Sequence, residues 1–424
     1  MREMLESGYE WLGVIPASWT LKKGKYLFCQ RNTKGNTKNL QLLSPTQHFG
    51  VIPQEMLEEL TTANVVKVKE DTDLATFKTI HEGDFCISLR SFQGGFEYSP
   101  YEGVVSPAYQ VFFATEHLCN GYYKYLFKDR NFIDKMNSYT MSLRDGKNIA
   151  FDDFGNTYIP VPPIEEQERI ADYLDTQSSR ISKASEGIQQ EIEILEQFKR
   201  SLIIETVIRG LSCTGPQKES EISWVGLIPA HWNVHPVYYY FGERKHKNIA
   251  GLETNLLSLS YGNVVRKDIN TTDGLLPASF NTYNIVEKDD IVIRPTDLQN
   301  DKKSLRTGLV KERGIITSAY IALRPIKKTS SRYFRYLLHA YDLMKVFYNM
   351  GNGVRQGLNF PEFSKLMIIE PPVSEQEEIA DYLDSRVDEI DSIIDKKRQQ
   401  IEVLADMRRS LVFECVTGKK EIPV

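Results

Sequence analysis

Two stretches of the chain place apolar residues at spacings of three, four and seven, sustained for about three heptads. Each stretch follows a Pro-Pro pair, which ends the preceding segment. This stripe is typical of a coiled-coil seam, so we predict a long helix after each pair. Ser374 and Glu377 have the spacing of a capping box, which predicts that the second helix starts there, whereas Glu165 is a poorer cap for the first. The predicted seam residues are Ile181, Ile188, Leu195 and Leu202 in the first helix and Ile390, Ile394, Ile401, Leu404 and Leu411 in the second.

A single stripe of this kind often packs against the core of its own domain. Two matching stripes in one chain favour pairing of the two helices with one another. Each helix leads out of its own domain into the next unit, and only the short turn at residues 214–216 separates the repeats. We therefore expect an antiparallel coiled coil with one domain at each end.

Between the helices the hydrophobic pattern changes to short β-branched or aromatic runs, interrupted by Gly, Pro, Asn and Asp. Runs of this length and composition predict many short strands. Residues 122–128 and 332–341 predict short helices late in each segment. The predicted fold class is α+β, with two similar domains separated by two long helices. The expected boundaries are 1–162 for the first domain, 163–211 for its helix, 212–371 for the second domain, and 372–424 for the second helix and tail.

The chain contains an internal repeat, because two of its motifs each occur twice. Residues 11–19, WLGVIPASW, return 213 positions later as residues 224–232, WVGLIPAHW. Residues 162–175, PPIEEQERIADYLD, return 209 positions later as residues 371–384, PPVSEQEEIADYLD. The two motifs frame each copy, and the similarity between them is fainter but keeps its order. One fold used twice, with different residues in its variable parts, follows from this repeat.

Charge is divided unevenly along the chain. The formal net charge is -5, which by itself disfavours a nucleic-acid partner. Residues 165–211 hold 10 acidic and 6 basic side chains, and residues 374–420 hold 12 and 8, so the acidic excess lies in the predicted helices. The rest of the chain is mildly basic, which permits DNA binding.

Other features exclude several classes of protein. The five cysteines are scattered and form no C-x-x-C pair, which disfavours a disulfide framework or a zinc site. His231 and His235 have the spacing of a metal pair but no third ligand nearby, so we expect no metal. The start of the chain lacks the apolar segment of a secretory signal, and no apolar run is long enough to span a membrane. We expect a cytoplasmic protein.

The two framing motifs resemble those of the specificity subunits of type I restriction-modification systems, and the resemblance covers nearly the whole chain. It implies that the variable segments are target recognition domains that bind double-stranded DNA. It also implies that the repeated helices separate these domains and bind two methyltransferase subunits, with restriction and translocase subunits joining through the assembled complex. The seam from Ile181 to Leu202 would be about 33 Å long, close to one turn of B-DNA. We therefore expect a bipartite target with a fixed gap.

Loops that follow strands and carry Arg are the best candidates for base contacts, because Arg bonds guanine and Gln or Asn bond adenine. Solvated loops and turn-stabilising contacts are the alternative interpretation. The paired tryptophans of the framing motif favour core packing over stacking on bases. The candidate DNA-binding residues are Arg90, Ser91, Gln93, Arg144, Lys147, Asn148, Arg294, Thr296, Gln299, Arg355, Gln356 and Asn359, together with a basic cluster suited to phosphates, Lys302, Lys303, Arg306 and Lys311.

The sequence offers no enzymatic motif. The Pro-Pro pairs lack the preceding Asn or Asp of a methyltransferase tetrapeptide, and no phosphate-binding G-x-x-x-x-G-K-[ST] loop occurs. We expect a non-catalytic subunit without a cofactor of its own, whose partner subunits handle S-adenosylmethionine, ATP and Mg. The alternative function is a coiled-coil scaffold whose variable domains bind protein rather than DNA.

Overall fold

The structure is a computed structural model that describes residues 2–34, 40–47, 49–61, 76–87, 95–139, 149–212, 214–269, 279–296, 305–350 and 357–423. Its contacts divide the chain into two compact units. Unit 1 comprises Met1–Ile188 and Gln399–Val424, and unit 2 comprises Gln189–Arg398. Each unit therefore contains one domain and a part of each long helix.

Unit 1 is built on a four-stranded antiparallel sheet with the order β4-β11-β8-β9. Two-stranded antiparallel pairs surround it, among them β1 with β2, β3 with β12 and β5 with β6. The elements are β1 (Met4–Glu6), β2 (Val14–Pro16), β3 (Thr20–Lys23), α1 (Gly24–Leu27), β4 (Phe28–Arg31), β5 (Leu43–Thr46), β6 (Gly50–Pro53), α2 (Gln54–Leu60), β7 (Lys78–Ile80), β8 (Phe85–Ile87), β9 (Phe96–Tyr98), β10 (Gly103–Val105), β11 (Gln110–Ala114), α3 (Asn120–Leu126), α4 (Arg130–Ser138), α5 (Phe151–Asn156) and β12 (Tyr158–Val161).

Unit 2 repeats this plan with the sheet order β16-β23-β20-β21. The predicted α+β domains are thus confirmed, as are the short helices near residues 122–128 and 332–341. The elements are β13 (Gln217–Glu219), β14 (Leu227–Pro229), β15 (Asn233–Pro236), η3 (Val237–Tyr239), β16 (Phe241–Glu243), β17 (Leu257–Ser260), β18 (Asn263–Arg266), β19 (Asn284–Val286), β20 (Ile291–Ile293), β21 (Thr307–Leu309), β22 (Gly314–Ile316), β23 (Ile321–Pro325), α7 (Ser331–Leu343), η4 (Val346–Asn349), α8 (Phe360–Phe363) and β24 (Met367–Glu370).

The tryptophans of the framing motif lie in the cores, as the sequence favoured. Trp11 and Trp19 are buried in the core of unit 1, and Trp232 is fully buried in that of unit 2. Trp224 is partly buried and packs against the same core. These side chains fix the start of each domain and are not free to stack on bases.

The long helices begin directly after the Pro-Pro pairs, which corrects the predicted capping box. Helix α6 spans Ile164–Arg209 and α9 spans Val373–Val416. Ser374 is therefore the second residue of α9 and cannot cap it. The Pro-Pro pair allows this early start because a proline lacks the N–H that a helix end leaves unpaired.

The two helices pack antiparallel inside unit 2. Lys397 forms an ion pair with Glu191, and Lys199 forms one with Asp391, so residue numbers rise along α6 as they fall along α9. Ile390 and Ile394 are buried, and the other predicted seam residues are half-buried. In unit 1 the end of α9 shares a core with the start of α6. The predicted antiparallel pairing is confirmed, and none of the described helices is long and apolar enough to cross a membrane.

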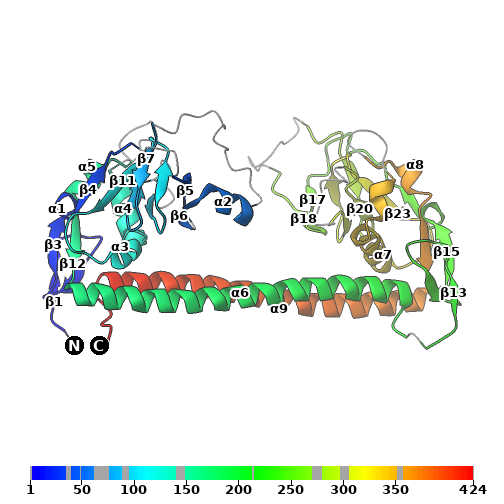
Figure 1. Cartoon of the computed structure of the whole chain (residues 1–424). Helices are drawn as coiled ribbons and strands as arrows, with labels where there is room; N and C mark the ends of the chain where they lie inside the picture. The colour runs from blue at the N-terminus through cyan, green and yellow to red at the C-terminus, as the bar shows by residue number, and fades with distance from the viewer. Residues whose placement is uncertain are drawn as a thin grey trace. The chain divides into compact units, whose positions relative to one another are not determined.

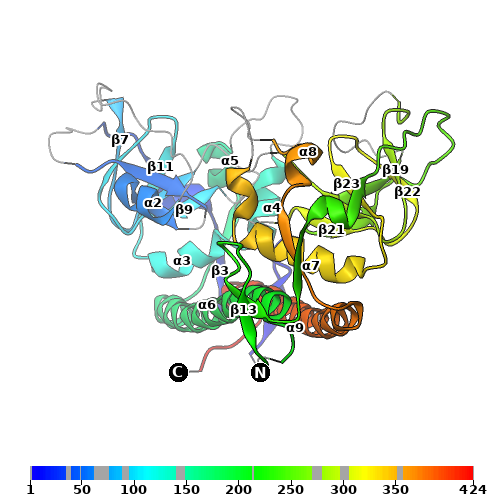
Figure 2. The same ribbon diagram turned by 90° about the vertical axis from the view of Figure 1, so that its right-hand side faces the viewer.

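A glutamate in each framing motif holds the tryptophan at the start of its domain. Trp19 Nε1 donates to Glu166 at 2.9 Å, and Trp232 Nε1 donates to Glu375 at the same distance. Arg2 is the second partner of Glu166, whereas His231 Nε2 lies 2.6 Å from Glu375. In Figure 2, β13, a strand that precedes Trp232 in the second copy, is drawn in front of the long helices.

A buried glutamine in each motif joins the long helix to a domain helix. In unit 1 the side chain of Gln167 accepts from Cys119 N at 2.9 Å and donates to the carbonyl of Pro162 at 2.8 Å. Gln376 makes the same contacts with Ser330 N and the carbonyl of Pro371. Cys119 and Ser330 are the residues that precede α3 and α7. The glutamine therefore satisfies backbone groups at the start of both helices.

Tyrosines complete the attachment from the domain side. Tyr125 donates to Asp175 at 2.6 Å, and Tyr336 donates to Asp384 at 2.7 Å. A second tyrosine in each unit reaches the end of the other long helix: Tyr122 donates to the carbonyl of Val416 at 2.7 Å, and its repeat counterpart on α7 donates to that of Val207 at 3.0 Å. Figure 1 shows α3 and α7 on the sides of their domains that face the long helices.

We predict that Gln376→Met lowers the free energy of unfolding of unit 2 by about 2–4 kcal/mol, because it leaves the Ser330 N–H and the Pro371 carbonyl buried without partners. Urea unfolding measures the loss. Glu377→Gln, at the exposed neighbouring position, is the matched control and should change stability by less than about 0.5 kcal/mol. Equal stability of the two variants would contradict the anchoring role.

One buried ion pair distinguishes unit 1 from unit 2. Lys128 Nζ lies 2.6 Å from Glu97, whose side chain is 2% exposed. Burial raises the pKa of Glu97 to about 7, although Lys128 acts in the opposite direction. In unit 2 the corresponding strand position is Gly308 and the corresponding helix position is His339.

The raised pKa predicts a pH-dependent stability. The native state holds the proton of Glu97 more tightly than the unfolded chain, so its contribution is present at low pH and is lost as the pH rises from about 4.5 through about 7. The stability of wild type relative to Glu97→Gln should fall by on the order of 2 kcal/mol over this window. Glu55→Gln, on the exposed face of α2, should show no such trend in the same series of urea unfolding curves. A constant difference between wild type and Glu97→Gln would exclude the titration.

Candidate nucleic-acid interface

The two Arg-bearing loops predicted in the second domain meet in the structure. Strand β20 ends at Ile293, and Arg294 and Thr296 follow it as exposed residues. Leu358, at the end of the second loop, donates its backbone N–H to the carbonyl of Pro295 at 3.0 Å. Segments about 60 residues apart in sequence thus form one surface at the end of β20.

In the first domain the described residues that flank the two predicted loops are also close together. Ile87, the last residue of β8, pairs with Gln110 at the start of β11. The side chain of Gln110 donates to the carbonyl of Ile149 and accepts from Phe151 N, both at 2.8 Å. The end of β8, which leads into one loop, therefore lies near Ile149, the first described residue after the other loop. The loops themselves lie outside the described residues.

Most of the predicted DNA-binding residues belong to these loops. Arg294, Thr296, Arg306, Lys311 and Asn359 are the members that the structure describes. The others lie outside the described residues, and their contacts with bases stay predictions: Arg90, Ser91, Gln93, Arg144, Lys147, Asn148, Gln299, Lys302, Lys303, Arg355 and Gln356.

Arg306 lies in the interior, which corrects its assignment to a phosphate-binding cluster. Its side chain is fully buried, and its Nε lies 3.8 Å from Asp342, which is fully buried as well. Its guanidinium also donates to the carbonyls of Arg294, at 3.3 Å, and Thr296. Arg306 therefore braces the loop from inside. A basic run in a sequence does not distinguish a buried, paired arginine from an exposed one.

Asn359 has a structural contact in addition to its predicted one. Its side-chain oxygen accepts from Glu362 N at 3.0 Å and caps α8. This is the turn-stabilising contact that the sequence left open as an alternative. The residue is exposed, so its contact with a base stays a prediction.

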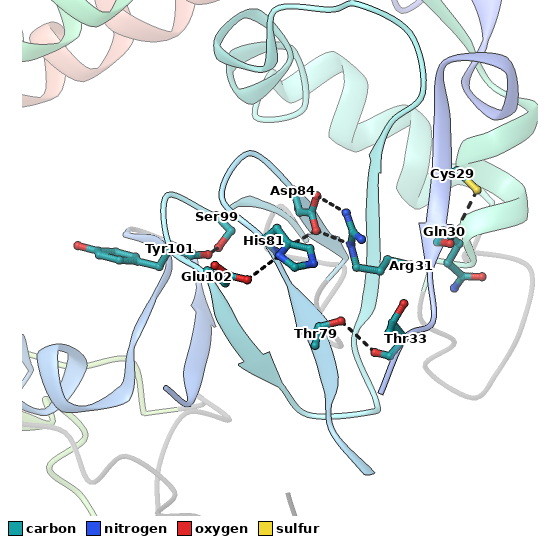
Figure 3. Close-up of polar contacts among 10 residues, drawn as sticks. All are labelled: Cys29, Gln30, Arg31, Thr33, Thr79, His81, Asp84, Ser99, Tyr101 and Glu102. Carbon is teal, nitrogen blue, oxygen red and sulfur yellow. Dashed lines mark hydrogen bonds and ion pairs between the residues drawn. The ribbon is translucent and has the colours of Figure 1, made fainter. Parts of the chain in front are cut away.

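A buried ion pair in each domain supports the strand that leads into the loops, and the sequence alone did not reveal it. Arg31 on β4 lies 2.7 Å from Asp84, directly before β8 (Figure 3). The guanidinium of Arg31 also lies over the ring of Phe113. The second copy pairs Arg244 with Asp290 directly before β20. Asp84 also accepts from the backbone N–H of His81 at 2.9 Å. The signal that could have found the pairs is the recurrence of all four residues at equivalent places in the repeat.

The described histidines of the predicted metal spacing have other contacts. His231 bonds to Glu375, and His235 stacks on the ring of Tyr239 with centroids 4.1 Å apart. Within the described part of the chain, no group of three or more His, Cys, Asp or Glu side chains has the arrangement of a metal site.

The described structure contains two copies of one α+β domain, each fixed to the paired long helices. The family comparison identifies this domain. The model of the type I restriction modification DNA specificity domain matches residues 15–194 and 262–403. The chain belongs to this family, and the two matched ranges correspond to the two copies.

Curated relatives carry the same description. The chain is 25% identical over 276 residues to the putative type I restriction enzyme MjaX specificity subunit of Methanocaldococcus jannaschii, a match that covers 62% of this chain and 59% of that protein. It is 23% identical over 286 residues to the type I restriction enzyme MjaVIII specificity subunit of the same organism, covering 63% of each. The matches thus span less than two thirds of these relatives.

Solved structures share the fold over nearly the whole chain. One comes from work on the structural basis of complex assembly and conformational transition of the type I R-M system. It has a TM-score of 0.70 at 13% identity and covers 96% of this chain and 99% of that one. The crystal structure of the HsdS subunit from Thermoanaerobacter tengcongensis has a TM-score of 0.53 at 13% identity, with coverages of 96% and 98%.

We predict that Arg306→Met costs about 3–5 kcal/mol of unfolding free energy, because it removes the buried guanidinium that lies 3.8 Å from the buried carboxylate of Asp342. Combining it with Asp342→Leu should recover much of this loss, since both charges are then absent from the interior. Urea unfolding of the three proteins gives the comparison. A DNA-contacting surface residue would instead leave the stability of Arg306→Met close to that of wild type.

Proposed function

We propose that this chain is the DNA-recognition subunit of a type I restriction-modification complex, in which each domain contacts one half of a bipartite target. The observation that carries the proposal is that the described residues flanking the two polar loops lie beside each other at the end of β8 and again at the end of β20. Arg, Gln and Asn in these loops match the hydrogen-bonding patterns of bases in the major groove. The family membership supports duplex DNA as the ligand.

The two halves of the target should be unrelated in sequence. The framing motifs are nearly the same in both copies, whereas the loops are not: residues 90–95 are RSFQGG and residues 294–299 are RPTDLQ, which share only the first Arg position by position. We assign the gap between the halves to the paired helices, which separate the two domains along the sequence. Family membership and the antiparallel ion pairs support this role for them.

Exposed apolar side chains on the long helices support two copies of one partner. Ile194 and Phe198 on α6 are 64% and 50% exposed, and Val403 and Met407 on α9 are 57% and 56% exposed. The two pairs lie 209 positions apart, which is the interval of the helix motif. Each pair is spaced by one helical turn and forms an apolar patch. We assign these two patches to two methyltransferase subunits.

The chain itself acts without catalysis in this proposal. The partner subunits bind S-adenosylmethionine, ATP and Mg and carry out methylation and cleavage, with the restriction and translocase subunits joining the assembled complex. The proposed location is the cytoplasm, where the complex has access to cellular DNA. The absence of methyltransferase and nucleotide-binding motifs from the sequence supports this division.

Selection from random duplexes, followed by binding at several salt concentrations, tests the proposal. A recognition subunit should enrich a bipartite motif and bind it 10³-fold or more tighter than random DNA, in the range typical of specific DNA-binding proteins. Arg294→Ala should relax the preference at a position in one half only. A scaffold that binds protein would enrich no motif and show no steep dependence on salt.

We predict that Phe198→Asp reduces the bound methyltransferase from two copies to one, and that adding Met407→Asp removes the second. A charge in either apolar patch makes burial of that patch unfavourable. Native mass spectrometry of the purified complex gives the stoichiometry. Gln190→Asp, which adds a charge at an exposed polar position of the same helix, should keep two copies. Two copies bound to the double variant would contradict the assignment.

A further inference from the structure

A groove of about 920 Å³ lies in unit 2 between the domain and the long helices. Its walls come from α7, the turn between β17 and β18, strand β21, and the parts of α6 and α9 that belong to this unit. The loop after β20 returns to the domain at this groove, since Leu305 and Thr307 line it. Leu305, the first described residue after one of the two loops proposed to contact bases, thus belongs to the groove.

The charged residues of the groove separate into paired and unpaired groups. Lys199 is paired with Asp391, Arg332 with Asp384, and Arg398 with Glu196. Three further cations line the groove, and in the described part of the chain none of them forms an ion pair. They are Arg200 on α6, Arg335 on α7 and Lys311 after β21, and Asp388 is the acidic lining residue that remains beside them.

The interior of the groove is electropositive without a protonated histidine. His339 lines it from α7, and burial lowers the pKa of His339 to about 3, with Arg335, Lys199 and Arg200 acting in the same direction. His339 is therefore neutral at physiological pH. Arg200 and Arg335, which contribute to lowering this pKa, also line the groove, and their charges would attract an anion there.

Unit 1 does not reproduce this arrangement. The counterpart of Arg335 is Lys124, which is paired with Asp175, and the strand position of Gly308 is taken by Glu97. The net charges of the whole domains differ in the same direction, with the second domain more basic. Residues 212–371 hold 21 Lys and Arg against 15 Asp and Glu, whereas residues 1–162 hold 17 against 19. The cationic groove is thus a property of the second copy.

We propose that this groove binds the phosphate backbone of duplex DNA next to the half-site contacted by the second domain, with Arg200, Arg335 and Lys311 as the phosphate ligands. The inference rests on the proposed function and adds an asymmetry to it. Phosphate contacts supply affinity that is independent of sequence and sensitive to salt. The second domain therefore provides most of the electrostatic attachment, while the first depends more on base contacts.

The test measures binding of the full-length chain to its selected duplex across a range of salt concentrations. Each phosphate contact contributes about 0.9 to the slope of log affinity against log salt concentration. Arg200→Gln combined with Arg335→Gln should lower this slope by about two and leave the selected motif unchanged. Lys311→Gln, at an exposed position outside the helices, should lower it by about one.

Lys218→Gln, on exposed β13 and away from the groove, is the control and should keep the full slope. Arg335→Lys should retain its contribution, because the charge remains. Wild-type binding with an unchanged slope in the double variant and in Lys311→Gln would overturn the groove assignment alone. If the wild-type chain shows neither a selected motif nor a salt-dependent affinity, the proposed function fails together with this inference.

Discussion

The attachment of each domain to its long helix depends on one buried glutamine. Gln167 and Gln376 satisfy backbone groups on both sides of the junction, and a glutamine can do this because its amide both donates and accepts. The neighbouring glutamate fixes the tryptophan that begins the domain, and an aspartate two turns later binds a domain tyrosine. These contacts recur in both copies, so the short motif that marks the repeat in the sequence is also the joint that holds each domain on the helices.

The sequence was sufficient for the architecture because the repeat and the heptad pattern are properties of many residues together. The sequence was not sufficient for single residues whose placement depends on the local environment in the folded chain. Arg306 stands among lysines, yet Asp342 holds it in the interior, and that partner is 36 residues away. Ser374 has the spacing of a cap, but the helix starts at Val373 because the preceding prolines allow it. The ion pairs Arg31 with Asp84 and Arg244 with Asp290 were missed because the members of each pair lie on different strands. The candidate loops were predicted from the strand ends that precede them. The contacts of Gln110 and Leu358 place the described residues that flank these loops beside each other.

The two copies share a scaffold, but in the proposed arrangement the second copy provides more of the electrostatic attachment to DNA. Conserved joints require the same residues in both units, whereas the surfaces toward a ligand do not. The pair Lys128 with Glu97 in one unit and the combination of His339 with Gly308 in the other illustrate this freedom. The change removes an acidic side chain from the corresponding strand of the second copy. A duplicated domain can thus diverge in affinity as well as in the bases it contacts while the fold stays the same.

We propose that each domain recognises its own half of the target independently. This can be tested on the methylated motif in cells that carry the complete system, before and after residues 20–160 are exchanged for the corresponding segment of another specificity subunit. One half of the bipartite motif should change while the other half and the gap stay the same. A change in both halves, or in the gap, would exclude independent recognition by the two domains.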